Sequence, residues 1–260
     1  MAYTPFDLTG KVALVTGGNG GIGLGMVEAL AQAGADVVVW GSNAEKNARA
    51  QERLKPIGVR VLVQRVDVSD EKAVAEGFTE AVSKMGRVDT VIANAGIGIK
   101  GKPFTDIPTE DYRRILSVNL DGVFFTFREA CRHMIARANA GDPGGSLVAI
   151  SSLSAIDGAA RNEHYAATKG ALLAMVKGLA VEHARYGVRA NSILPGWIAT
   201  DMTQGSQDNE VFTSKVISRV PMRRWGEPSD FGGMAIYLAS DASKFHTGDQ
   251  MLIDGGYAVF

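Results

Sequence analysis

The fold is decided by Val12-Ala-Leu-Val15 and the residues that follow it, Thr16-Gly17-Gly18-Asn19-Gly20-Gly21-Ile22-Gly23. A short apolar run bounded by glycines predicts a buried strand, and the apolar spacing after residue 21 predicts a helix to about residue 33. Glycines permit a tight turn and a close approach of the backbone to a pyrophosphate, while free N–H groups at a helix start favour phosphate. The stretch predicts a dinucleotide-binding unit, although an ordinary tight turn would use the same residues.

Beyond this unit, short β-branched runs alternate with longer segments of helical period. Further strands are predicted at residues 37–40, 59–66, 88–93, 147–151 and 188–194, and helices at 44–55, from 69 onward, at 108–138 and at 163–186. This alternation predicts an α/β fold, a Rossmann-like doubly wound parallel sheet with helices on both faces and ligands at the carboxyl ends of its strands. No linker-like segment divides the chain, so a single domain over residues 1–260 is expected.

The composition excludes several classes of protein. The chain has 260 residues, 46% hydrophobic and 21% charged, with a net charge of −1 and one cysteine, Cys131. These values are those of a globular protein and argue against a nucleic-acid partner, a disulfide framework and a cysteine-rich zinc site. Without a long apolar run or a leader-like start, a cytoplasmic protein with no membrane partner is expected. The four histidines are too scattered to predict a metal site: His133, His164, His183 and His246.

The end of the second predicted strand bears on the choice of coenzyme. An acidic side chain there binds the ribose of NAD, and a basic one accommodates the 2′-phosphate of NADP. This chain has Trp40-Gly41-Ser42-Asn43, which is neither. Ser42, Asn43 and Lys46 could donate hydrogen bonds to a phosphate, which favours NADP slightly over NAD. Equally, Ser42 and Asn43 could simply cap the next helix.

The most informative side chains are Ser152, Tyr165 and Lys169. Tyr165 and Lys169 are four residues apart on a predicted helix and so share one face. A nearby ammonium stabilises phenolate and lowers the pKa of tyrosine, so that the phenol can exchange a proton with an alcohol or an alkoxide. Ser152, after the fifth predicted strand, could hold the same oxygen. Alternatively, both helix residues could only reach the surface of an amphipathic helix.

Together these stretches resemble the short-chain dehydrogenase/reductase family over about residues 8–257. The glycine turn, Ala93-Asn94-Ala95-Gly96, the separation of Ser152 from Tyr165, and the tail from Thr247 to Gly256 carry the resemblance. It implies a catalytic tetrad of Asn119, Ser152, Tyr165 and Lys169. It also implies contacts with the coenzyme by Tyr165 and Lys169, in addition to Ser42 and Asn43. The other implied coenzyme contacts are Gly17, Asn19, Gly20, Gly21, Ile22, Gly23, Asp67, Val68, Asn94, Ala95, Gly96, Pro195, Gly196, Ile198 and Thr200.

The resemblance implies a role for each member of the tetrad in NAD(P)-dependent hydride transfer. Tyr165 would be the acid/base, Lys169 would lower its pKa and bind the nicotinamide ribose, and Ser152 would orient the substrate oxygen. Asn119 would hold a water that links Lys169 to solvent, unless it satisfies buried backbone instead. Thr200 and the Ile198 backbone would hold the carboxamide.

The substrate is expected to be a small, mostly apolar ketone or secondary alcohol under a lid at about residues 196–225. The expected contacts are Ile97, Ile156, Asn162, Trp197 and Met202. The nearest branches are 3-oxoacyl-carrier-protein reductases and sugar or cyclic-alcohol dehydrogenases. Arg132 matches one of two arginines that dock the acyl carrier, but Val181 occupies the other position. Alternatives are therefore a carrier-protein reductase or a non-catalytic NAD(P)-binding regulator; a homotetramer is expected in the enzymatic reading.

Overall fold

The computed structural model describes residues 4–99 and 101–260, and within them the strands form one parallel sheet of seven. The strand order is β3-β2-β1-β4-β5-β6-β7. The strands are β1 (Val12–Thr16), β2 (Asp36–Gly41), β3 (Val61–Arg65), β4 (Thr90–Ala93), β5 (Gly145–Ile150), β6 (Val188–Pro195) and β7 (Gln250–Ile253). The order reverses between β1 and β4, which is where a doubly wound sheet opens a crevice for a ligand.

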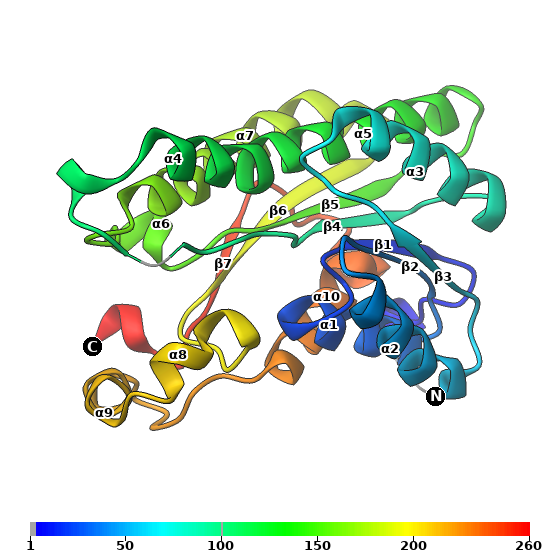
Figure 1. The fold of residues 1–260 in the computed structure, drawn as a ribbon. Helices are drawn as coiled ribbons and strands as arrows, with labels where there is room; N and C mark the ends of the chain where they lie inside the picture. The colour runs from blue at the N-terminus through cyan, green and yellow to red at the C-terminus, as the bar shows by residue number, and fades with distance from the viewer. Residues whose placement is uncertain (1–3, 100) are drawn as a thin grey trace.

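Helices cover both faces of the sheet, as Figure 1 shows. One face carries α1 (Gly21–Gln32), α2 (Ala44–Leu54) and α10 (Gly232–Ala239). The other carries α3 (Glu71–Met85), α4 (Thr109–Leu116), α5 (Gly122–Asn139) and α7 (Glu163–His183). Each layer has its own apolar core, one built around Leu14 and Phe127 and the other around Val15 and Phe231. The predicted α/β doubly wound fold is confirmed.

Local sequence sets where several helices begin and end. The Asp70 carboxylate accepts hydrogen bonds from the backbone N–H groups of Lys72 and Ala73, and α3 ends at Gly86 with φ of 84°. Asn43 caps α2 by accepting from Lys46 N. Such caps satisfy N–H groups that have no acceptor within the helix, which explains why the predicted starts of these helices were accurate.

The single helix predicted at residues 108–138 was wrong in one respect. A π-turn at Ser117–Asp121 separates α4 from α5. Inside this turn the Asn119 amide donates to Ile97 O at 3.0 Å, and its carbonyl oxygen accepts from Ile97 N at 2.8 Å. The wider turn therefore brings a fully buried asparagine to the backbone of the segment after β4. π-bulges of this kind are frequent at functional sites.

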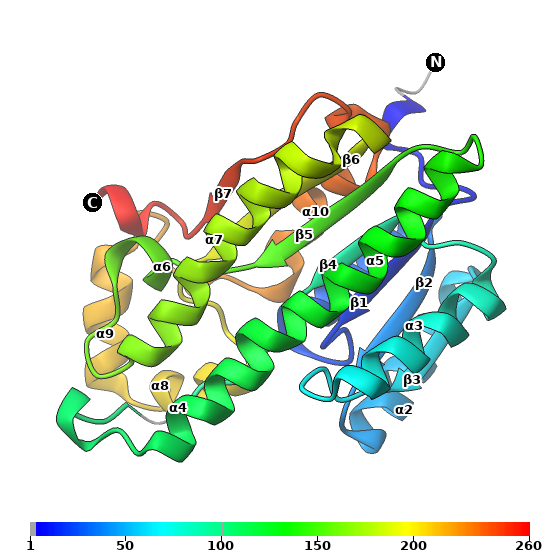
Figure 2. The same ribbon diagram turned by 90° about the horizontal axis from the view of Figure 1, so that it is seen from above.

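The segments outside the two helical layers gather at one end of the sheet. Figure 2 shows α6 (Ser154–Asp157), α8 (Gln204–Gln207) and α9 (Glu210–Arg219) beyond the end toward which β5 and β6 run. The chain ends beside them in a 3₁₀ turn, Tyr257–Val259. Among the described residues, no helix combines the length and apolar character needed to cross a bilayer.

Candidate active site

The glycine-rich turn forms an anion-binding cradle at the start of α1. Gly17 and Gly21 have φ of 63° and 50°, which favours glycine at both positions. At Gly23 an added Cβ would lie 2.3 Å from Gly17 O, so no side chain fits there. Gly20 precedes α1 and supplies no side-chain cap, which leaves N–H groups of the first turn available to an anion. This geometry fits the pyrophosphate of a dinucleotide.

The turn is tied to the end of β4. Asn94 donates from Nδ2 to Thr16 O at 3.0 Å and to Gly17 O at 3.2 Å. The backbone N–H groups of Asn94 and Ala95 both donate to Thr16 Oγ1. Asn94 therefore fixes the turn against β4. Thr16 also holds the turn against β4, and its position at the end of a buried strand was the feature of the sequence that could have predicted this.

The end of β2 leaves no room for an acidic residue at position 41. A Cβ on Gly41 would lie 2.0 Å from Asn19 Nδ2 and 2.4 Å from Asn47 Oδ1. These two side chains are hydrogen-bonded to each other at 2.7 Å, and Asn47 also donates to Gly41 O. The space that a ribose-binding carboxylate would use is thus filled by two amides.

The remaining coenzyme contacts expected near the adenosine are exposed or held by local bonds. Asn43 caps α2, as the alternative interpretation stated, and Ser42 O accepts from Arg65 Nε at 3.2 Å. Asp67 accepts from Ser69 N and Ser69 Oγ, while Val68 is buried under Gly122. The segments after β4 and β6, which are expected to bind the coenzyme, lie at the same edge of the sheet, where a Cβ added to Gly21 would lie 3.3 Å from Thr200 Cγ2.

An ion pair that the sequence did not predict crosses this edge. Lys46 Nζ of α2 lies 2.6 Å from Asp201 Oδ2, in the segment that follows β6. This contact lowers the pKa of Asp201, because the ammonium stabilises the carboxylate. The pair joins the lid segment to the end of the crevice beside Ser42.

The four residues of the expected tetrad come from three parts of the chain: Asn119 from the π-turn, Ser152 from the segment after β5, and Tyr165 and Lys169 from α7. Lys169 of α7 donates from Nζ to Ile150 O at 2.8 Å and is buried. Gly96, after β4, faces both Lys169 Nζ and Asn119 Oδ1, which would lie 3.5 and 3.4 Å from an added Cβ. Lys169 Nζ also lies 5.7 Å from the centre of the Tyr165 ring. The predicted helical spacing of Tyr165 and Lys169 is therefore present in the fold.

Burial dominates the electrostatics of this cluster. It lowers the pKa of Lys169 to about 8, because an ammonium is costly away from water. Desolvation likewise raises the pKa of Tyr165, and a hydrogen bond from Ser152 offsets only part of that rise. In the protein without coenzyme the pKa of Tyr165 is therefore above its ordinary value, whereas a lowered pKa was expected, and the effect of Lys169 on it stays a prediction. Ser152 Oγ also accepts from Ser154 N at 3.1 Å.

The expected substrate residues divide into two groups. Ile97, Asn162 and the exposed Ile156 and Met202 lie on the segments that follow β4, β5 and β6. Met202 approaches Gly98, since a Cβ there would lie 3.5 Å from Met202 Cγ. Several buried polar atoms near them have no protein partner in the described part of the chain, and Ser154 Oγ and Asn162 Oδ1 are among them. Ser154 was not predicted, and its only sequence signal was its position two residues after Ser152.

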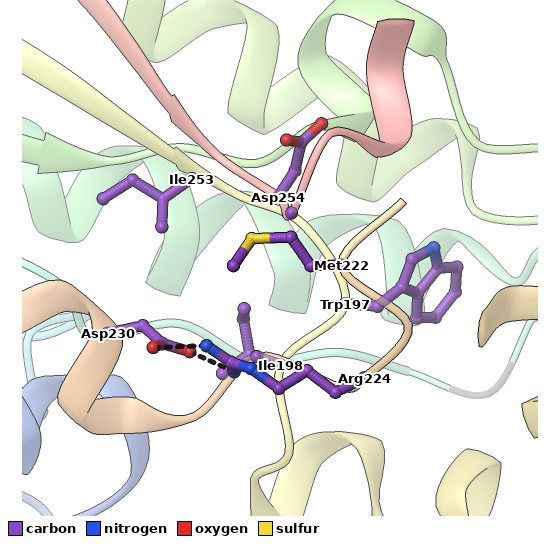
Figure 3. A pocket seen from close by; sticks show the side chains of 9 residues that line it. Trp197, Ile198, Met222, Arg224, Asp230, Ile253 and Asp254 are labelled. Atoms are coloured by element: carbon purple, nitrogen blue, oxygen red, sulfur yellow. Dashed lines mark hydrogen bonds and ion pairs between the residues drawn. The ribbon is translucent and has the colours of Figure 1, made fainter. Parts of the chain in front are cut away.

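Trp197 instead lies in an aromatic cluster. Its ring packs against Phe212 of α9 at 5.2 Å, Trp225 at 5.9 Å and Tyr257 at 6.5 Å between ring centres. Figure 3 shows Trp197 at the edge of a cavity of about 190 Å³, which Ile198, Met222 and Arg224 also line. Arg224 makes two bonds to Asp230 there, of 2.7 and 2.8 Å. No tetrad residue lines this cavity, so it lies beside the candidate active site.

Two further observations bear on the chemistry that the chain supports. Burial raises the pKa of Cys131 to about 12, so its thiol is packed and unreactive. Among the described residues, no group of His, Cys, Asp and Glu side chains has an arrangement suited to a metal ion.

Comparison with known proteins agrees with this geometry. The family model described as enoyl-(acyl carrier protein) reductase matches residues 17–258. The gluconate 5-dehydrogenase of Gluconobacter oxydans is 37% identical over 254 residues, covering 98% of this chain and 97% of that protein. The chain belongs to the short-chain dehydrogenase/reductase family. It is an oxidoreductase that uses NAD(P) and acts on CH–OH and C=O groups.

Two further proteins are similar to this dehydrogenase/reductase over nearly its whole length. The 3-oxoacyl-(acyl-carrier-protein) reductase FabG of Chlamydia pneumoniae is 35% identical and covers 96% of this chain and 97% of that protein. A crystal structure of a gluconate 5-dehydrogenase from Burkholderia cenocepacia, in complex with NADP and tartrate, is 35% identical, with a TM-score of 0.92 and 98% coverage of each chain.

Proposed function

We propose that this enzyme interconverts a ketone and a secondary alcohol on a small hydroxylated carboxylic acid, with NADP(H) as coenzyme and Tyr165 as the acid/base. One observation carries the proposal: the Tyr165 phenol, the Ser152 hydroxyl and the buried Lys169 ammonium meet at the edge of the sheet that also holds the glycine cradle. A regulator without turnover would not require this arrangement, since binding of a dinucleotide uses only the cradle.

Each residue of the tetrad has a defined task in this proposal. The bound nicotinamide coenzyme supplies or accepts the hydride. Tyr165 donates the proton that the substrate oxygen gains as the carbonyl is reduced, and removes it in the reverse direction. Ser152 donates a hydrogen bond to the same oxygen. Lys169 contributes positive charge beside the phenol, which favours its anion once the proton has left.

Asn119 is proposed to act at one remove from the substrate. Both polar ends of its side chain bind the Ile97 backbone. This contact matches the alternative role considered for it, satisfaction of buried backbone. The predicted water relay to Lys169 stays a prediction, and the Asn119 side chain would support it by holding the segment after β4 in place.

The preference for NADP is supported by the end of β2. Gly41 leaves no room for a carboxylate, Arg65 Nε donates to Ser42 O, and the Lys46 backbone N–H donates to the neighbouring Asn43 side chain. A 2′-phosphate placed beside Ser42 would share Lys46 with Asp201, which already binds that ammonium. The Burkholderia relative was crystallised with NADP, in line with this preference.

The substrate class is supported by polar atoms in an otherwise apolar lining. Ser154 Oγ and Asn162 Oδ1 are buried without a protein partner in the described chain, and substrate hydroxyl groups could bind them. Gluconate 5-dehydrogenases act on such a hydroxylated acid, as their name states. An acyl-carrier substrate is less well supported, because Arg132 is bound to Glu129 at 2.6 Å and Val181 is 83% exposed at the second docking position.

A substrate panel tests the proposal. Purified enzyme would be mixed with NADPH or NADH and with a keto sugar acid, an apolar cyclic ketone or a 3-oxoacyl thioester, and oxidation of the coenzyme followed by absorbance. We expect the highest kcat/KM with NADPH and the keto acid. Turnover of none of the three would contradict the enzymatic assignment, and a preference for the thioester would identify the carrier-protein alternative.

The predicted assembly and location accompany this function. The single domain with a lid at about residues 196–225 is consistent with α8 and α9 lying over the substrate edge. A homotetramer is supported by exposed apolar side chains on α5 and α7 and at the chain end, namely Phe124, Val181, Val259 and Phe260. Light scattering would measure the mass of the assembly. A cytoplasmic location accords with the single, buried cysteine.

A further inference from the structure

A second polar cavity lies at the opposite end of the sheet from the active site. It has a volume of about 180 Å³ and is lined where β5 and β6 begin and where α10 ends. Figure 2 shows that these strand starts lie far from α8 and α9. Its cationic side chains belong to Lys11, Arg87, Arg137, Arg189 and Lys244, and its carboxylates to Asp89, Asp142 and Asp241.

Two of the arginines are fully engaged by two of the carboxylates. Arg137 lies 3.1 Å from Asp89 and 2.9 Å from Asp142, while Arg87 lies 2.7 Å from Asp89 and 3.4 Å from Asp142. Asp89 also accepts from Val12 N. These four side chains form a neutral network that fixes one wall of the cavity.

The other three cations are not balanced. The one carboxylate left, Asp241, is 75% exposed in its side chain and lies 3.8 Å from Lys11, a loose contact. Arg189 and Lys244 have no carboxylate within ion-pair distance among the described residues. The cavity therefore carries two positive charges in excess, which is the charge of a phosphate dianion with opposite sign.

Arg189 gives the cavity a directional donor. Its Nη2 donates to Leu238 O at 2.7 Å, at the end of α10, which holds the guanidinium in place. Its Nη1 is buried and has no acceptor in the described part of the protein. A buried donor on a charged group without a partner is costly, and guanidinium groups bind phosphate oxygens with strong charge-assisted hydrogen bonds.

We propose that this cavity is a phosphate-binding site, in which Arg189 Nη1 and the ammonium groups of Lys11 and Lys244 bind inorganic phosphate or a phosphate monoester. The site is separate from the coenzyme crevice and does not depend on the proposed substrate. A cavity of about 180 Å³ has room for a phosphate group.

The test measures phosphate binding with the coenzyme site already filled. The enzyme, saturated with NADP⁺, would be titrated with inorganic phosphate at constant ionic strength, and binding followed by the ³¹P line width and by the thermal unfolding temperature. We expect saturable binding with a dissociation constant on the order of 1 mM. A second titration with glycerol phosphate distinguishes a site for free phosphate from one that also admits a monoester.

Substitutions in the cavity, compared with a matched control pair, decide whether the cavity is responsible. Arg189→Gln combined with Lys244→Gln should weaken binding at least tenfold, whereas the matched pair Lys55→Gln and Lys72→Gln on exposed helix surfaces should leave it unchanged. Asp241→Asn should tighten binding twofold to threefold, because it removes the competing carboxylate. If the Arg189 variant does not fold, Lys244→Gln alone should still weaken binding about threefold. Equal weakening in both pairs, or no saturable binding, would overturn the proposal.

Discussion

Two parts of the candidate active site differ in how far water reaches their charged groups. We call the buried part around Asn119 and Lys169 the wall, and the exposed part with Lys46, Asp201, Arg219 and Tyr257 the rim. In the wall, Asn119 and Lys169 are buried, and each is bonded to backbone carbonyl or amide groups. At the rim, the Lys46–Asp201 pair has side chains that are 44% and 84% exposed, and Arg219 reaches Tyr257 across the surface. Water screens charges at the rim and not in the wall. We therefore expect single substitutions in the wall to change activity strongly and single substitutions at the rim to change it weakly.

The largest effect should follow from removal of the phenol in the wall. Tyr165→Phe deletes the hydroxyl proposed to exchange a proton beside Ser152, so kcat should fall by about 10³-fold. Coenzyme binding, measured by the fluorescence of NADPH, should change little because the cradle is untouched. Ser152→Ala, which keeps the phenol, serves as the comparison and should lose less. Retention of turnover by Tyr165→Phe would refute the role assigned to the phenol.

The buried ammonium should control how stability depends on pH. The pKa of Lys169 is about 8 in the folded protein, below the ordinary value of 10.5 that it regains on unfolding. Between these two values the unfolded chain binds more protons, so the free energy of unfolding should rise with pH. From pH 8 to pH 10 the expected rise is about 2 kcal/mol.

Urea unfolding of the coenzyme-free protein at pH 7 to 10 measures this rise. Lys169→Met should abolish the rise of the free energy of unfolding with pH. Its gain in stability over the parent protein should be larger at pH 7 than at pH 10. Lys177→Met, an exposed lysine of the same helix, should keep the rise. A rise that persists in Lys169→Met would mean that the ammonium is not desolvated. The raised pKa of Tyr165 acts in the opposite direction, and only above about pH 10.

Features set by short-range spacing could be predicted from the sequence. The strand, glycine turn and helix from Val12 onward depend on neighbouring residues, and Tyr165 and Lys169 share a face because they are four apart. The order of strands and helices likewise followed from local patterns of apolar residues, and the family resemblance supplied the positions of Asn119 and Ser152.

Features set by distant contacts could not be predicted. The π-turn around Asn119 depends on Ile97, a residue 22 positions away along the chain. The exclusion of a side chain at Gly41 requires Asn19 and Asn47 to meet over it. The direction of the Tyr165 pKa shift depends on how completely the folded chain covers the phenol, and spacing along a helix contains no information about that cover.

A smaller effect is expected for the ion pair at the rim. Lys46→Gln should lower the ratio of kcat/KM for NADPH to that for NADH about fivefold, because an exposed charge pair contributes about 1 kcal/mol. Asp201→Asn should raise the same ratio, since it frees Lys46 for the 2′-phosphate. Steady-state kinetics with both coenzymes measures the ratio, and Lys55→Gln at the other end of α2 is the control. The same change in both lysine variants would exclude a specific contact.

The smallest effect should come from the contact between the lid and the chain end. Arg219 of α9 donates to the Tyr257 hydroxyl at 2.8 Å, and its guanidinium lies 4.3 Å from the centre of that ring. Tyr257→Phe removes the hydrogen bond and keeps the ring packed near Trp197. Because the contact is exposed, we expect a loss of less than about 1 kcal/mol, seen as a twofold to threefold rise in substrate KM with kcat unchanged. Tyr257→Ala, which also removes the ring from the aromatic cluster, should raise KM further. A change in kcat instead of KM would place the chain end in the wall of the site rather than at its rim.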